Sequence, residues 1–160
     1  MGRKGLSLFV VLTLVLTVFA IVPLNVSAAT INVPDDYPTI QQAIDNANPG
    51  DTIIVKPGTY TEQLTINKNI DLVGQSGAKI VAPDSSTRNT YKIQESTHTF
   101  DPIIFAYGGI YSAGNNTVWG SGVIHVNISG FEIDGQNDGI GDVYAGIFLR
   151  NVDGRIYNNY

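Results

Sequence analysis

The sequence has no cysteine and a single methionine, Met1, so it offers neither a disulfide nor the soft sulfur ligands that copper handling needs. Its two histidines, His98 and His125, have no second histidine and no pair of carboxylates beside them in sequence. A surface or strand role is the simpler interpretation of both. Basic residues are few and form no stripe. These absences argue against a disulfide-stapled domain, a histidine-based centre and nucleic acid as a partner.

The N-terminus carries an apolar run of the kind that directs export. Arg3 and Lys4 precede the span 6–22, and Val26-Ser27-Ala28 provides the small residues of a cleavage site. We therefore predict a signal peptide over residues 1–28, with an uncleaved N-terminal anchor as the alternative, because the run is nearly long enough to span a bilayer. Either way, residues 29–160 are expected to be secreted or at the cell surface. Membrane contact is expected only through the N-terminal segment, if it is uncleaved.

A short amphipathic helix is predicted to follow. Thr39 is placed as its N-cap, with Gln42 as the reciprocal partner of a capping box. The apolar residues of one helical face are Ile40, Ala43, Ile44 and Ala47. Asn48-Pro49-Gly50 ends the helix, because proline disfavours the α conformation in the residue before it. A helix this short must pack on something else.

Four short β-branched runs come next, at 52–55, 63–66, 70–73 and 78–81, separated by turn residues. Very short strands without intervening helices favour a coil of parallel rungs over a doubly wound sheet. The sequence therefore predicts an all-β fold, a right-handed single-stranded parallel β-helix with a short N-terminal capping α-helix.

Short β-branched runs separated by turn residues recur later in the chain. Segments 126–135 and 150–159 share a pattern of β-branched, polar and glycine residues, and the step from Ile128 to Val152 suggests a 24-residue repeat. Residues 83–101 are rich in Ser, Thr and Asp, and we expect them to form a loop insertion.

Several motifs resemble a known superfamily. They are TIQQAI at 39–44, GDTI at 50–53, KPGTY at 56–60, Glu62, and LVG at 72–74. They are similar to the N-terminal region shared by pectin methylesterases and the broader pectin-lyase-like right-handed β-helix superfamily. In its low-charge, Asn- and Gly-rich style the chain looks most like exported β-helix surface proteins, including NosD-related ones. The resemblance is specific over 33–81 and generic over 123–160. It implies the fold far more strongly than any activity.

An esterase role can be tested on the residues. The strand AGIFLR at 145–150 is similar to a pectin methylesterase strand, but Ala145 stands where that family has the oxyanion-stabilising Gln. The aspartate motifs that supply the nucleophile and the proton shuttle do not follow. No catalytic residue is therefore assigned, and the expectation leans away from an enzyme. If the protein is one, a polysaccharide lyase or a carbohydrate esterase is implied.

The best candidate metal ligands are Asp134, Asp138 and Asp142, on a glycine-rich turn whose oxygen ligands would suit Ca²⁺. Their spacing does not match an EF-hand, and a plain solvated turn is the alternative. No other cofactor is expected. Without residues 1–28, which contain Arg3 and Lys4, seven basic residues remain against 14 acidic ones, a net charge of −7. Such a surface would repel polyanions unless calcium bridged them.

Aromatic residues gather in the second half of the chain. We expect Phe105, Phe131 and Phe148 to lie in the core, and the candidate carbohydrate contacts are Tyr111, Trp119 and Tyr144. The partner class implied is a polysaccharide or a cell-surface glycan.

The end of the chain also carries an expectation. Residues 155–157 read as a strand with no polar cap after them, and a solenoid needs such a cap. We therefore expect an N-terminal fragment of a longer chain, or else another domain or chain that covers this end. The predicted function is an exported β-helix protein, a carbohydrate-binding or structural module without catalysis in this segment. The alternative is the N-terminal fragment of a pectate lyase-like or pectin esterase-like enzyme.

Overall fold

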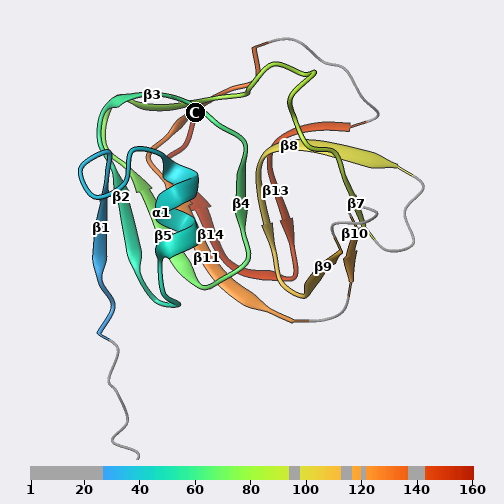
Figure 1. Cartoon of the computed structure of the whole chain (residues 1–160), viewed down its shortest axis with the longest axis horizontal. Coiled ribbons are helices and arrows are strands. Elements are labelled where there is room, and N and C mark those ends of the chain that lie inside the picture. The colour runs from blue at the N-terminus through green and yellow to red at the C-terminus, as the bar shows by residue number, and fades with distance from the viewer. Residues whose placement is uncertain (1–26, 94–97, 113–116, 120–121, 137–142) are drawn as a thin grey trace, which may run out of the picture.

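The computed structural model describes residues 27–93, 98–112, 117–119, 122–136 and 143–160. Within them the fold is all-β apart from one short helix, α1 (Ile40–Asn46), as Figure 1 shows. The strands are β1 (Thr30–Val33), β2 (Thr52–Val55), β3 (Gly58–Thr61), β4 (Leu64–Ile66), β5 (Ile70–Gly74), β6 (Ala78–Val81), β7 (Tyr91–Ile93), β8 (Thr99–Tyr107), β9 (Ile110–Ser112), β10 (Thr117–Trp119), β11 (Ile124–Ser129), β12 (Glu132–Asp134), β13 (Val143–Arg150) and β14 (Val152–Tyr157).

The strands form three sheets, most of whose pairs are parallel. Sheet A has the order β1-β2-β5-β11-β14, and sheet B has the order β12-β6-β3. In sheet C, β8 pairs in parallel with β4 and β13, while β7, β10 and β9 extend the sheet beyond β8. The chain visits sheets A, B and C in that order through β2, β3 and β4, then again through β5, β6 and β8, and again through β11, β12 and β13. The predicted all-β class with parallel strands is confirmed.

The main core lies between the inward faces of the three sheets. Period-2 alternation puts one residue in two on that face, as the pattern of buried and half-buried residues in β2 and β5 shows. The largest side chains that are fully buried in this core are Phe131, Ile40, Ile44, Ile53, Leu64, Ile66, Ile70, Leu72, Ile80, Ile103 and Ile104. Burial of these apolar side chains is the main stabilising contribution in a chain without disulfides.

Helix α1 packs against β1, β2 and β4 with its predicted apolar face, and Figure 1 shows it in front of the strands. The Thr39 hydroxyl accepts a hydrogen bond from the amide of Gln42 at 3.2 Å, as the capping box predicts. The amides of Ile40 and Gln41 are satisfied from outside the helix, because both donate to the carboxylate of Glu62 at 2.9 Å. Glu62 therefore ties the start of the helix to the segment before β4.

The register between β11 and β14 differs from the predicted 24-residue repeat. Ile128 pairs with Ile156, and the backbone amide of Arg155 donates to the side chain of Asn127, 28 residues earlier. Val152 pairs with Ile124 instead. The connection between the two strands, which contains β12 and β13, makes the step 28 residues, so the 24-residue repeat was wrong.

The segment 83–101 is only partly a loop. It contains β7, and β8 begins at Thr99, so the middle of the segment pairs antiparallel with its end, through Tyr91 with Phe100 and Lys92 with Thr99. Asp101 is 8% exposed. The polar composition of this segment predicted a loop because the strand residues alternate too briefly to show a period.

An aromatic cluster lies apart from the main core. Phe105 pairs with Thr65 and lies between Ile104 and Ala106, which face the core, so its ring is on the opposite face of sheet C. It packs with Tyr91 and Tyr107, and Phe148 packs against this cluster while only partly buried. Phe105 is thus buried as predicted but outside the main core, whereas Phe131 lies within it.

No helix in the part of the chain that the structure describes is long and apolar enough to cross a membrane. The predicted signal peptide lies outside the described residues, except for Ser27 and Ala28.

Candidate functional site

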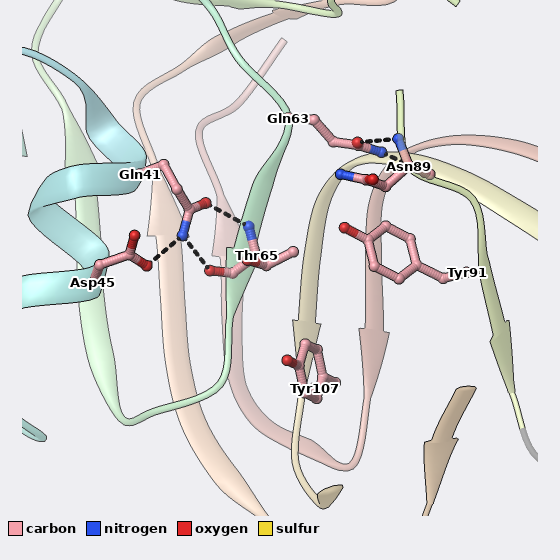
Figure 2. A pocket seen from close by; sticks show the side chains of 7 residues that line it. All are labelled: Gln41, Asp45, Gln63, Thr65, Asn89, Tyr91 and Tyr107. Atoms are coloured by element: carbon pink, nitrogen blue, oxygen red, sulfur yellow. Dashed lines mark hydrogen bonds between the residues drawn. The ribbon is translucent and has the colours of Figure 1, made fainter. Parts of the chain in front are cut away.

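A groove opens between helix α1 and the outer face of sheet C, next to the aromatic cluster. It has a volume of about 380 Å³. Figure 2 shows the residues that line it: Gln41, Asp45, Gln63, Thr65, Asn89, Tyr91 and Tyr107. They come from α1, from β4 and the residue before it, from β7 and the segment before it, and from the end of β8. The groove therefore exists only because the segment between β6 and β8 folds back beside the helix.

One wall is held by Gln41, which acts as a backbone partner for strand β4. Its side-chain oxygen accepts from the amide of Thr65 at 2.8 Å, and its side-chain nitrogen donates to the Thr65 carbonyl at 3.2 Å. The same nitrogen donates to Asp45 Oδ1 at 2.8 Å, as Figure 2 shows. These bonds satisfy the edge of β4 that faces the helix and fix the position of the Asp45 carboxylate.

The opposite wall is held by Gln63 in the same manner. Its side-chain oxygen accepts from the amide of Asn89 at 2.7 Å. Its side-chain nitrogen donates to the carbonyls of Asn89 at 2.9 Å and Pro102 at 2.8 Å. The backbone at Asn89 is therefore anchored, while its side chain is exposed at the rim.

The floor is aromatic. Tyr91 and Tyr107 are 4% and 6% exposed, and the Phe105 ring lies 4.7 Å from the Tyr91 ring and 4.9 Å from the Tyr107 ring, between centroids. In Figure 2 both tyrosine hydroxyls point towards the side formed by Gln41 and Thr65. A ligand in the groove would therefore meet the hydroxyl edges of two rigidly packed rings.

The lining carries one charged side chain, that of Asp45. The nearby cation Lys68 donates to the backbone carbonyls of Asp45 and Ala47, both at 3.0 Å, and so neutralises the C-terminal end of α1. Hydrogen bonds from Ser86 lower the pKa of Asp84, and the charge of the buried Arg88 lowers it further. The groove thus presents an exposed carboxylate, amide and hydroxyl groups, and aromatic edges, which suit hydroxyl-rich neutral ligands.

The three predicted carbohydrate contacts lie on strands of the same sheet. Tyr111 is in β9 and Trp119 is in β10, which pair antiparallel, and Tyr144 is in β13 opposite Asp101 of β8. Their side chains lie outside the described residues. Sequence reasoning missed Tyr91 and Tyr107 as groove residues. The sequence carried little signal for them, because the other residues that line the groove with these tyrosines are mostly far away in the chain.

Asp134, the described member of the predicted calcium cluster, is engaged in an ion pair. Lys79 contacts Asp134 at 2.9 Å and Glu132 at 2.8 Å across β6 and β12. The hydrogen bond from Lys79 and that from the Gln136 amide lower the pKa of Asp134, and the two carboxylates raise the pKa of Lys79. Asp138 and Asp142 lie outside the described residues. Within the described ranges, no group of three His, Asp or Glu side chains is arranged to hold a metal ion.

The outer face of sheet A carries two smaller hollows that share His125 and Asn127. Asn127 Nδ2 donates to Asp71 at 2.7 Å and lies 3.3 Å from His125 Nε2. His125 Nδ1 lies 4.0 Å from Asp153. His125 is exposed on β11, and the polar residues around it, Asp71, Asn127 and Asp153, come from the adjacent strands β5, β11 and β14.

Comparison with known proteins places the chain in a family. Residues 28–160 match the family described as "Protein of unknown function (DUF1565)", and the chain belongs to it. The chain is also similar to a protein of Methanothermus fervidus named "Cell surface glycoprotein", with 31% identity over 111 residues, 66% of this chain and 18% of the relative. It thus spans about a fifth of the length of that relative. No solved structure matches the chain.

Proposed function

We propose that this chain is part of a cell-surface protein built on a right-handed parallel β-helix of the pectin-lyase-like kind, and that it binds glycans without catalysis. Support for the β-helix comes from the repeated passage through sheets A, B and C with parallel pairing inside each sheet. The surface location is supported by the similar cell surface glycoprotein and by the export-type sequence over residues 1–28.

The groove between α1 and sheet C carries the glycan-binding part of the proposal. Sugars are recognised by fixed amide, carboxylate and hydroxyl groups beside aromatic surfaces. Asp45, Thr65 and Asn89 supply the polar groups, and Tyr91 and Tyr107 supply the aromatic edges. Gln41 and Gln63 hold the walls, so little ordering is needed when a ligand binds.

The charge of the groove indicates which glycans fit. The one charged side chain of its lining is the carboxylate of Asp45, which is exposed. Two like unit charges about 4 Å apart repel by about 1 kcal/mol in water, which is about fivefold in affinity. Neutral and amine-bearing sugars are therefore expected to bind more tightly than uronates of equal length.

The experiment is a binding panel of neutral, amine-bearing and uronate oligosaccharides, measured by calorimetry with and without calcium while released product is recorded. The double variant Asp45→Ala/Asn89→Ala should weaken neutral oligosaccharide binding at least tenfold. The control is Asp153→Ala, on sheet A, which should leave binding unchanged. The absence of binding by every oligosaccharide would refute the glycan-binding proposal, and calcium-dependent product would replace it with the lyase alternative.

A further inference from the structure

The buried carboxylate of Asp51 sits at the point where the predicted leader would be removed. Asp51 is 2% exposed, directly before β2. Its Oδ1 accepts from the backbone nitrogen of Ala29 at 2.8 Å, and its Oδ2 accepts from that of Asn48 at 2.8 Å. The carbonyl of Ala29 accepts from the amide of Thr52 at 2.9 Å, so Ala29 leads directly into sheet A.

The two backbone donors are neutral when the chain is intact, and a buried carboxylate with only neutral partners is unusual. Among the described residues, the cation that acts on Asp51 is Lys68, through a weak electrostatic attraction and without an ion pair. The Lys68 ammonium instead bonds the carbonyls of Asp45 and Ala47. Among the described residues, Asp51 is thus held by backbone hydrogen bonds and forms no side-chain ion pair.

We propose that a signal peptidase cuts the chain between Ala28 and Ala29, and that the new α-ammonium of Ala29 forms an ion pair with Asp51. The sequence before the bond, Val26-Ser27-Ala28, places small residues one and three positions before the cut. Ser27 and Ala28 are exposed and precede the first strand, so a protease can reach the bond.

The step is a hydrolysis. Water adds across the Ala28–Ala29 peptide bond, Ala28 keeps a carboxylate, and Ala29 gains an amine that is protonated at neutral pH. The nitrogen that donates to Asp51 Oδ1 is the same atom before and after the cut. Cleavage thus turns a neutral hydrogen bond into a charge-assisted one at a carboxylate that is 2% exposed in the intact chain.

The first test is the N-terminal residue of the protein exported by a host with a signal peptidase, read by Edman sequencing and intact mass. Ala29 is the expected first residue. A chain that keeps its leader, or one that begins at another residue, would overturn the proposed cut.

The second test is the pKa of the α-amino group of that exported protein, titrated by NMR after ¹⁵N labelling. An ion pair with Asp51 should raise the pKa by at least about one unit above the usual 7.7–8.0, a tenfold change in proton affinity. The variant Asp51→Asn should return it to the usual range. A normal α-amino pKa in the wild-type protein would overturn the ion pair.

Enzymatic acetylation of Ala29 provides a comparison that leaves Asp51 intact. Acetylation keeps an N–H donor but removes the charge, so the acetylated protein should unfold at a lower urea concentration at pH 7. A cation whose pKa is raised by folding stabilises the folded state at a pH below its pKa in the unfolded chain. This contribution is lost as the pH rises through its pKa in the folded protein. The difference should therefore disappear at high pH. Equal midpoints at pH 7 would overturn the proposal even if Asp51→Asn fails to fold.

Discussion

Glu62 is expected to contribute more to stability than any other exposed or half-exposed carboxylate that the structure describes. Its two oxygens accept from the amides of Ile40 and Gln41, both at 2.9 Å and partly shielded from water. These are amides of the first turn of α1, which have no partner inside the helix. The carboxylate also lies at the positive end of the helix dipole.

The magnitude follows from these two bonds. A hydrogen bond to a charged group contributes about 1.5–3 kcal/mol, and water can replace part of it at a partly shielded site. Glu62→Ala should therefore lower the free energy of unfolding by about 2–3 kcal/mol. Glu62→Gln keeps one acceptor and loses the charge, so about 1–2 kcal/mol is expected.

Urea unfolding of the purified protein, followed by circular dichroism, measures these changes. The matched control is Glu132→Gln, because the Glu132 carboxylate is in a partly exposed pair with Lys79, and surface pairs contribute about 0–1 kcal/mol. If Glu62→Ala costs no more than Glu132→Gln, Glu62 does not hold the start of α1 and the reasoning is refuted.

Three further outcomes are expected. Gly130 has φ +82° and a Cβ there would lie 2.1 Å from the Gly74 carbonyl oxygen, so Gly130→Ala should lower the free energy of unfolding in urea by about 2–4 kcal/mol. The control Gly50→Ala, at φ +99° in open space, should lower it by only about 1–2 kcal/mol, and equal losses would contradict the close approach at Gly130. Leu72 is 0% exposed in the main core, so Leu72→Ala should cost about 2–5 kcal/mol, and a loss below 1 kcal/mol would contradict its burial. Hydrogen bonds from Ala29 and Asn48 lower the pKa of Asp51 below its ordinary 3.8. The contribution of Asp51 to the free energy of unfolding should therefore be fully present above pH 3.8 and be lost as the pH falls below it, and Asp51→Asn should weaken this dependence. An acid-unfolding curve that the variant leaves unchanged would refute this.

Local features of the fold could be predicted from the sequence. The helix that begins at Ile40 and the strands β2, β4, β5 and β6 follow from the spacing of apolar residues and from the turns between them. Strand β3 was missed, because Gly58-Thr59-Tyr60-Thr61 has the composition of a turn and shows its alternation only at the buried Tyr60.

Long-range features could not be predicted. The pairing of Ile128 with Ile156 depends on the length of the connection between β11 and β14, which contains β12 and β13 and which sequence similarity does not report. The burial of Phe105 on the outer face of sheet C depends on the segment that folds over it. The groove joins residues as far apart as Gln41 and Tyr107, and its walls are held by amide side chains that bond distant backbone. A pattern of single residues carries no signal for such a contact.

Glycan binding in the groove can be located by an NMR chemical-shift map of the amide-labelled protein, titrated with the oligosaccharide that binds most tightly in the panel. Glycan binding in the groove predicts that the largest shifts fall on the backbone amides of Thr65, Asn89 and Tyr91 and on the side-chain amide of Gln41. Shifts centred on His125 and Asn127 of sheet A, or no shifts at saturating ligand, would contradict the claim.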